Sequence, residues 1–210
     1  MVLLAFVSSY LIGSTPTAYL IGKWTRGIDI RQHGSGNVGA TNVFRTVGRG
    51  WGSVALIGDM GKGFLVTYFA APYFFQLANP SAFSLISFQL LLGLLAIAGH
   101  TWPVWLKFHG GKGVATSCGV FLGIYPKAVL LALAIWILVA FLSRYVSLSS
   151  IIAAFSFSIW LFVFYRNSSD FFLSLVISVV LFIFIVWTHR KNISRLFAGT
   201  ESKIGSRNNS

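Results

Sequence analysis

The chain has 210 residues and a mass of 23.0 kDa, 56% of its residues are hydrophobic, and its mean hydropathy is +0.78. Only 10% of the residues are charged, against roughly 25% in a soluble globular domain. This composition excludes a water-soluble globular protein, a disordered chain and a collagen-like repeat. We interpret the sequence as an all-α, multi-pass membrane protein that forms a single domain over residues 1–210.

The charge balance is strongly basic, with 16 Lys and Arg, four Asp and Glu, and a net charge of +12. A basic chain can bind nucleic acid, but cytoplasmic loops of membrane proteins also accumulate Lys and Arg, and we favour this second explanation. Four carboxylates offer few oxygen ligands for magnesium or calcium. The single cysteine, Cys118, excludes an intramolecular disulfide and a thiolate zinc site. We therefore expect no nucleic-acid partner, no metal and no cofactor.

Seven apolar segments predict seven transmembrane helices, on the basis that roughly twenty apolar residues cross a bilayer as a helix. In chain order they cover about residues 2–21, 51–75, 82–106, 114–125, 128–142, 148–165 and 171–187. The fourth segment falls below spanning length, and a count of five spans also fits if two short segments do not cross. Nearly all loop Lys and Arg lie on the side of residues 23–50, whereas the opposite side has Lys127 and Arg166. This bias predicts an external N-terminus and a cytoplasmic C-terminus, with a basic tail over residues 189–210.

The loop over residues 23–50 carries the strongest local signal, the stretch RQHGSGNVGATN at residues 31–42. Glycines let backbone N–H groups converge on an anion, and Ser, Asn and Thr side chains add neutral donors. A guanidinium adds a planar fork suited to phosphate. The alternative is a tight cytoplasmic turn with ordinary positive charge. We predict a substrate loop whose ligands are Gly34, Ser35, Gly36, Asn37, Gly39, Thr41, Asn42 and Arg45.

A second glycine-rich loop, residues 107–113, precedes the short fourth segment. The free N–H groups at the start of a helix, together with Lys112, would make a compact site for a phosphate or an oxyanion. A glycine hinge between two spans is the alternative. The candidate ligands are Gly110, Gly111, Lys112, Gly113 and Thr116. We expect the two glycine-rich loops to meet over one cavity at the cytoplasmic surface.

Polar residues within or beside the apolar segments form a weaker group of candidates. Asp59 and Lys62 share one helical face, and a structural ion pair is at least as plausible as a catalytic role. His100 is expected to brace a helix end. His189 and Asn192 follow the last segment, where basic clusters are routine. We assign Asp59, Lys62 and His100 a supporting role.

Distributed motifs give the chain a family resemblance. They include GSTPTAYL at residues 13–20, GSGNVGATN at 34–42, DMGKG at 59–63, GHTWP at 99–103, FHGGKGVAT at 108–116 and HRKNI at 189–193. With these motifs the chain resembles the bacterial acyl-phosphate:glycerol-3-phosphate acyltransferases. The resemblance implies transfer of an acyl group from acyl phosphate to the 1-hydroxyl of glycerol-3-phosphate. The products would be lysophosphatidic acid and inorganic phosphate, in the first step of bacterial phospholipid synthesis.

The resemblance also implies a location, partners and site residues. It places a seven-helix, metal-independent enzyme in the bacterial cell membrane, with its active site facing the cytoplasm. Expected partners are the two substrates, the lipid bilayer and, transiently, other enzymes of phospholipid synthesis. The implied catalytic residues are Ser35, Arg45, Lys112, His189 and Asn192. The segment Ser147–Ser150 is expected to contribute a hydroxyl, with Ser150 as the candidate substrate ligand.

Two other classes of function remain open at this level. A membrane transporter of an organic phosphate would also have basic loops and glycine-broken helices, but its polar residues would line several helices. Here the polar groups gather at one face of the predicted membrane domain. A non-catalytic membrane scaffold would leave the two glycine-rich loops unexplained.

Overall fold

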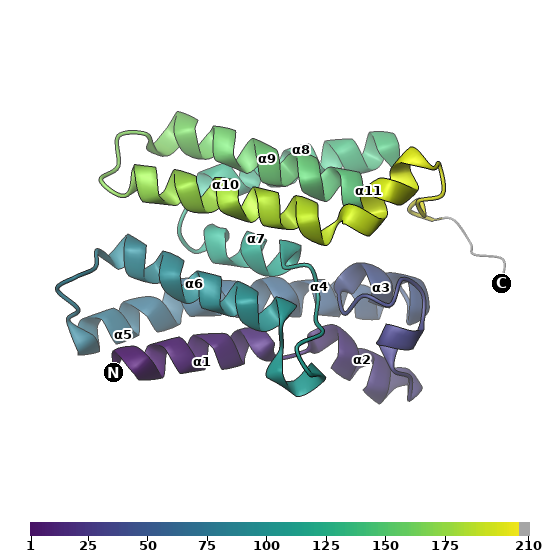
Figure 1. Ribbon diagram of the computed structural model, residues 1–210, viewed down its shortest axis with the longest axis horizontal. Coiled ribbons are helices and arrows are strands. Elements are labelled where there is room, and N and C mark those ends of the chain that lie inside the picture. Colours follow the sequence, from purple (N-terminus) through teal and green to yellow (C-terminus); the bar gives the residue numbers. More distant parts are fainter. Residues whose placement is uncertain (206–210) are drawn as a thin grey trace. The chain divides into compact units, whose positions relative to one another are not determined.

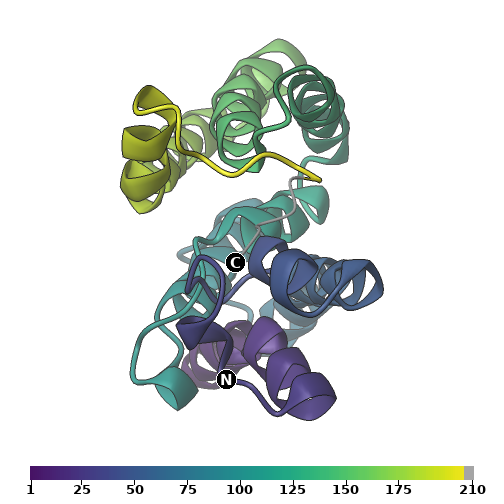
Figure 2. The same ribbon diagram turned by 90° about the vertical axis from the view of Figure 1, so that its right-hand side faces the viewer.

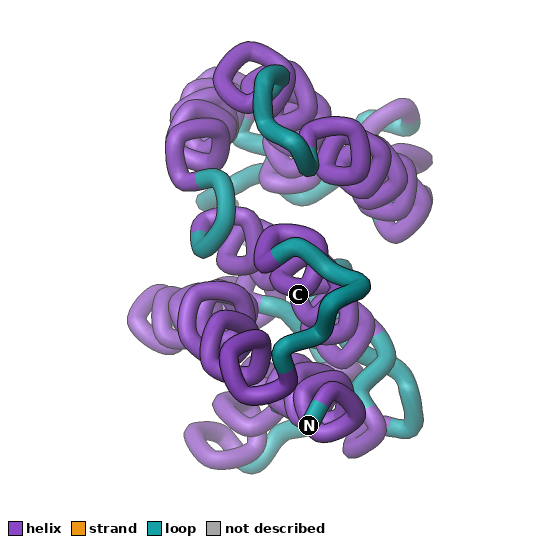
Figure 3. Tube along the Cα trace, turned by 90° about the vertical axis from the view of Figure 1, so that its left-hand side faces the viewer, coloured by secondary structure: helices purple, strands orange, loops and turns teal. Residues whose placement is uncertain are grey.

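The computed structural model describes residues 1–205, and these residues contain helices and loops but no strand (Figure 3). The all-helical class is therefore confirmed. Contacts divide the chain into two compact units, Met1–Ile124 and Tyr125–Ser210. A single domain over residues 1–210 stays a prediction, and the last five residues of the predicted basic tail lie outside the described part.

The first predicted span is wrong as one continuous helix. Residues 2–21 instead form α1 (Val2–Ser14) and the start of α2 (Thr17–Arg26), and the two helices are bent by 40° (Figure 1). The break has a local cause, because Pro16 lacks an N–H and disfavours helical dihedrals in the residue before it. Thr15 accordingly has an extended ψ of 113°.

The second span is the longest apolar helical run, Arg49–Ala78, and it changes its winding midway. It consists of α4 (Arg49–Phe64), a π-helical stretch η2 (Leu65–Ala70) and α5 (Ala71–Ala78). Pro72 lies directly after the wider turn. A proline cannot donate to the preceding turn and its ring crowds the carbonyl four residues earlier, so a wider turn at this place accommodates it.

Two further helices complete the first unit, α6 (Leu85–Thr101) and α7 (Val114–Leu122). Glycines allow close helix contacts: a Cβ on Gly13 would overlap the backbone of Ala96, and a Cβ on Gly119 would overlap the backbone of Met60. These contacts join α1 to α6 and α4 to α7. The nine residues of α7 rise about 14 Å, against about 30 Å for the hydrocarbon core, so α7 alone does not cross it.

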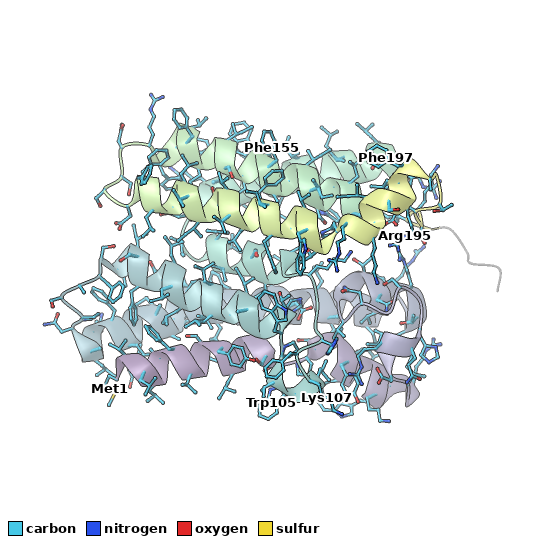
Figure 4. The ribbon with its side chains drawn as sticks, in the orientation of Figure 1. Met1, Trp105, Lys107, Phe155, Arg195 and Phe197 are labelled. Atoms are coloured by element: carbon cyan, nitrogen blue, oxygen red, sulfur yellow. The ribbon has the colours of Figure 1, made fainter. Side chains whose placement is uncertain are left out.

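The second unit is built on three apolar helices, α8 (Pro126–Ser143), α9 (Val146–Tyr165) and α10 (Phe171–Thr188). Within this unit α9 packs against both α8 and α10 (Figure 2). A short polar helix, α11 (Arg190–Phe197), follows at the end of α10. Its Phe197 is 90% exposed and projects from the helix (Figure 4).

The described residues contain five helices long and apolar enough to cross a membrane, or six if the bent α1–α2 pair is one span. The multi-pass prediction is thus supported, and the segment ends agree with the sequence to within a few residues. The short fourth segment of the prediction corresponds to α7. The count of seven spans and the orientation of the termini stay predictions.

Candidate active site

The Asn42 side chain forms hydrogen bonds with three backbone groups of the first glycine-rich loop. Asn42 lies in the short helix α3 (Ala40–Thr46) and is fully buried. Its Nδ2 donates to the carbonyl oxygens of Ile30 and His33, both at 3.0 Å, and its Oδ1 accepts the N–H of Ser35 at 2.9 Å. Both amide hydrogens therefore bind backbone oxygens. Asn42, predicted as a substrate ligand, acts in this structure as the residue that positions the loop.

Two glycines of this loop occupy positions where the backbone leaves no room for a side chain. Gly34 and Gly36 have φ values of +61° and +71°, a region that side chains rarely adopt. A Cβ on Gly34 would also overlap the Asn42 amide. Ser35 lies between these two glycines and is exposed, so the tight turn presents its hydroxyl at the surface of the loop.

A local ion pair occupies the start of the same loop. Asp29 begins a short 3₁₀ turn, η1 (Ile30–Gln32), and accepts the backbone N–H of Arg31 at 3.0 Å. The Arg31 guanidinium donates to Asp29 at 2.6 Å and stacks 5.4 Å from the centre of the Tyr19 ring. Hydrogen bonding to Arg31 holds the pKa of Asp29 below its usual range. The Arg31 guanidinium is therefore engaged locally, in the ion pair with Asp29.

The second glycine-rich loop is held against the end of α6. The N–H groups of Gly110 and Gly111 donate to the carbonyls of Thr101 at 3.0 Å and His100 at 3.1 Å. A Cβ on Gly111 would overlap the His100 ring and come within 2.7 Å of the Val38 carbonyl oxygen. The two loops therefore touch each other, as the sequence predicted. The shared cavity stays a prediction.

The second loop leads directly into α7. Gly113 has a φ of +82° and precedes the first helical residue, and Lys112 is half-buried beside it. Thr116 and Ser117 follow in the first turn, and both are buried. Their hydroxyl oxygens have no hydrogen-bond partner within residues 1–205. The first turn of α7 thus has two buried hydroxyls in need of a hydrogen-bond partner, close in sequence to Lys112.

A buried charge cluster lies beneath this loop. The Lys62 ammonium is 2.9 Å from Asp59 Oδ1, 2.9 Å from His100 Nδ1 and 3.0 Å from the Thr15 carbonyl oxygen. Asp59, Lys62 and His100 are each less than 10% exposed. The predicted ion pair of Asp59 and Lys62 is thus present. His100 braces the end of α6, as expected, and its carbonyl also holds Gly111.

The second unit contains a separate polar cluster centred on Glu201, a residue that we did not predict. Its carboxylate accepts hydrogen bonds from Asn192 Nδ2 at 2.6 Å, Arg195 Nε at 2.7 Å and Ser147 Oγ at 2.9 Å. Burial disfavours the charged form, but these hydrogen bonds outweigh it and hold the pKa of Glu201 below its usual range. The sequence signal that could have pointed to Glu201 is that the chain has only four acidic residues. With so few acids, each one is a candidate for a specific interaction with basic or polar partners.

Two predicted residues of the second unit lie near that cluster in sequence but make other contacts. His189 is buried at the junction of α10 and α11, and its Nδ1 donates to the Ile185 carbonyl at 2.8 Å. This bond places a proton on Nδ1, because a carbonyl oxygen can only accept. Ser150 donates to the Val146 carbonyl at 2.8 Å and receives the indole N–H of Trp136 at 3.2 Å. Within the predicted segment Ser147–Ser150, Ser147 supplies the hydroxyl at the Glu201 carboxylate.

Comparison with known proteins shows the family of the chain. A family model described as glycerol-3-phosphate acyltransferase matches residues 3–199. The chain belongs to this family. A glycerol-3-phosphate acyltransferase of Synechococcus sp. (strain CC9902) is 44% identical over 209 residues, covering 99% of this chain and 98% of the relative. The corresponding protein of Fusobacterium nucleatum subsp. nucleatum is 46% identical over 198 residues, covering 94% of this chain and 95% of the relative.

Solved structures agree with the family assignment. A crystal structure of PlsY (YgiH), an integral membrane glycerol 3-phosphate acyltransferase in its glycerol 3-phosphate form, is 35% identical and matches with a TM-score of 0.83. It covers 97% of this chain and 96% of the other. The lysophosphatidic acid form of PlsY matches with a TM-score of 0.81 and 34% identity. This acyltransferase chain is accordingly a membrane enzyme with several apolar helices, like the integral membrane protein PlsY.

Within the acyltransferase fold, the predicted site residues fall into two groups. The first unit holds the two loops and the charge cluster beneath the second loop, with Gly34, Ser35, Gly36, Asn37, Gly39, Thr41, Asn42, Arg45, Asp59, Lys62, His100, Gly110, Gly111, Lys112, Gly113 and Thr116. The second unit holds Ser150, His189 and Asn192. Asn37 and Thr41 are half-buried, and Gly39 is the extended residue before α3. Substrate binding by each of these residues stays a prediction.

Proposed function

We propose that this membrane glycerol-3-phosphate acyltransferase takes its acyl group from an acyl phosphate and transfers it to the 1-hydroxyl of glycerol-3-phosphate. The family and the curated relatives carry the acceptor in their names. The two PlsY structures are described as the glycerol 3-phosphate and lysophosphatidic acid forms, which are an acceptor and a product of this reaction. The donor is the part of the proposal that rests on the motifs alone.

The contact between the two glycine-rich loops carries the structural side of the proposal. Gly111 lies against the Val38 carbonyl, so a residue of the second loop touches a residue of the first loop within the first unit. The free N–H groups at the start of α7 and the unpaired hydroxyls of Thr116 and Ser117 are suited to an anion. A phosphate would satisfy donors that have no partner among the described residues.

Roles follow from charge and position. Arg45 and Lys112 bind substrate phosphate, Ser35 donates its hydroxyl and the Gly110–Gly113 backbone approaches the ligand closely. His189 and Asn192 are further substrate ligands on the strength of the family resemblance. Asn42 positions the first loop and Glu201 positions Asn192 through its 2.6 Å hydrogen bond.

The reaction needs no strong protein base. The 1-hydroxyl oxygen attacks the acyl carbon, the bond from that carbon to the phosphate oxygen breaks, and inorganic phosphate leaves with the bonding pair. The hydroxyl proton passes to a substrate phosphate oxygen. Lys112 and backbone N–H groups stabilise the negative charge that develops on the acyl oxygen, and the loops align the two substrates.

The proposed setting is the bacterial inner membrane, with both glycine-rich loops facing the cytoplasm. The supporting observation is the bias of Lys and Arg to the side of these loops. Five long helices, the bent α1–α2 pair and the short α7 together give the proposed seven segments. An external N-terminus and a cytoplasmic C-terminus follow from that count.

The direct test uses purified enzyme, labelled glycerol-3-phosphate and a long-chain acyl phosphate, without added metal. Lysophosphatidic acid and inorganic phosphate should appear in equal amounts. The matched control replaces acyl phosphate with the corresponding acyl-CoA. Equal turnover with acyl-CoA, or no turnover with acyl phosphate, would overturn the proposed donor while leaving the acceptor assignment intact.

A further inference from the structure

The charge cluster beneath the second glycine-rich loop has a hydrogen-bond arrangement that determines where the His100 proton lies. A lysine ammonium has three donors and no acceptor. Lys62 has three acceptors within 3.0 Å, namely Asp59 Oδ1, the Thr15 carbonyl oxygen and His100 Nδ1. All three ammonium hydrogens are therefore used, and His100 Nδ1 receives one of them.

If Nδ1 carried a proton, its N–H would point at an N–H of the Lys62 ammonium, and two donors form no hydrogen bond. A doubly protonated ring would in addition place a second positive charge 2.9 Å from that ammonium. The Asp59 carboxylate could compensate, but it is farther from Nδ1, at 3.4 Å. One carboxylate and one ammonium already balance within a buried site, where unbalanced charge is costly. The arrangement fits a neutral His100 whose single proton is on Nε2.

The Nε2 side of the ring faces the second glycine-rich loop. A Cβ on Gly111 would overlap Nε2, so the ring edge lies directly against the backbone of that residue. The His100 carbonyl meanwhile accepts the Gly111 N–H at 3.1 Å. One residue thus contacts the loop through both its main chain and its ring, and no hydrogen bond among residues 1–205 uses the Nε2 proton.

We propose that Asp59 and Lys62 fix His100 as the neutral tautomer protonated on Nε2, and that this ring positions the Gly110–Gly113 loop for substrate phosphate. His100 is a positioning residue, because it contacts the loop and not the reacting atoms. Lys62 supplies the hydrogen bond that orients the ring, and Asp59 balances the Lys62 charge. The phosphate part rests on the proposed function, whereas the tautomer does not.

The tautomer is tested by nitrogen NMR on detergent-solubilised protein labelled with ¹⁵N at its four histidines. Comparison with His100→Gln assigns the His100 signals. We expect an unprotonated Nδ1 and a protonated Nε2 at neutral pH. In Lys62→Met the ring should instead carry a proton on Nδ1, which then faces Asp59. A wild-type ring protonated on Nδ1, or on both nitrogens, overturns the proposal, and so does an unchanged tautomer in Lys62→Met.

Loop positioning is tested by a matched pair of variants. The glutamine amide of His100→Gln reaches the place of Nε2, whereas the shorter amide of His100→Asn ends near Nδ1. We expect His100→Asn to lower kcat/KM for glycerol-3-phosphate about a hundredfold, the size of effect that a 1 Å displacement can cause, mainly through a higher KM. We expect His100→Gln to retain activity within about tenfold of wild type.

A purely structural role of His100 would reduce the amount of active enzyme in both variants and leave KM unchanged, and that result overturns loop positioning. Inactive wild-type enzyme would instead refute the proposed function. The NMR measurement still decides the tautomer in that case, so the two failures are distinguishable.

Discussion

At the scale of single residues, the structure shows which polar side chains hold the fold, and substrate binding by the others is a prediction. Asn42 and Arg31 both lie in the first glycine-rich loop, yet their hydrogen bonds go to the loop backbone and to Asp29. Arg45 and Lys112 are the cations that we assign to phosphate. Sequence spacing alone did not separate these two groups, because all four residues have the chemistry of a phosphate ligand.

Arg45→Ala and Lys112→Ala should each lower activity at least about a hundredfold, because removing a charged hydrogen-bond partner from a binding site commonly costs about 2–5 kcal/mol. The matched controls are Arg49→Ala, an exposed arginine at the start of α4, and Lys107→Asn, an exposed residue in left-handed conformation that asparagine tolerates. Both controls should stay within about threefold of wild type, the range expected for exposed charges. Near-normal turnover of folded Arg45→Ala and Lys112→Ala would refute the phosphate assignment.

The lowered pKa of Glu201 predicts how the stability of the protein depends on pH. Its folded-state pKa is lowered, so it contributes stability that is present above the usual carboxyl pKa and is lost as the pH falls through the lowered value. Glu201→Gln removes this contribution, and the buried polar partners lose a charged acceptor. We expect a lower Tm at neutral pH, by several degrees. The difference from wild type should shrink in acid, as measured by thermal unfolding in detergent across pH 3 to 7.

A Tm difference that is constant across this range would mean that the ionised carboxylate is not what stabilises the tail. Asp170→Asn is the matched control, because Asp170 is a half-buried acid of the same unit and lies at the start of α10, outside the Glu201 cluster.

At the scale of helices, glycines decide which elements approach closely. Gly61 and Gly63 are two residues apart in α4, but only Gly63 faces α7. A Cβ on Gly63 would overlap the Thr116 carbonyl and lie 2.9 Å from the Val120 nitrogen, whereas a Cβ on Gly61 meets nothing within 4 Å. The start of α7 therefore depends on the absence of one side chain in α4.

Gly63→Ala should displace α7 and with it the Lys112 loop. Overpacking of this kind costs about 1–3 kcal/mol, so we expect a clearly lower Tm and a loss of activity. Gly61→Ala is the control on the same helix and should leave both unchanged. Thermal unfolding and initial rates measure the two effects, and equal behaviour of the two variants would contradict the close contact between α4 and α7.

At the scale of the whole molecule, orientation is predicted from charge alone. Single cysteines in a Cys118→Ser background test it in sealed inner-membrane vesicles of known sidedness. Ser35 and His109, both exposed in the glycine-rich loops, should react with a membrane-impermeant thiol reagent from the cytoplasmic side. Ser81 and Asn167, exposed in the opposite connections, should react only from the other side. Labelling of both pairs from the same side would refute the seven-segment topology.

Metal independence is a second prediction for the whole enzyme. Only four acidic residues exist, and in the described chain Asp29, Asp59 and Glu201 are each paired with a cation. Activity should therefore be unchanged in excess EDTA, because too few carboxylates are left to hold magnesium. A reproducible loss of activity on chelation that magnesium restores would contradict this expectation.

The sequence by itself determined the membrane class, the positions of most helices and the family. Apolar composition and segment length reflect the bilayer and need no tertiary contact, which explains why α8, α9 and α10 agree with prediction. Pro16 is a residue type that favours a bend, but the surrounding run of apolar residues led us to predict one continuous helix.

Only the tertiary structure decided which polar residues meet. Gly111 and Val38 are brought together by α6 and the first loop. The Lys62 ammonium receives its three acceptors from α4, from α6 and from Thr15 between α1 and α2. Glu201 gained its role in the same way, from partners on α9 and α11. Such contacts depend on side-chain direction and on helix packing distance, and a linear pattern of residue types specifies neither of them.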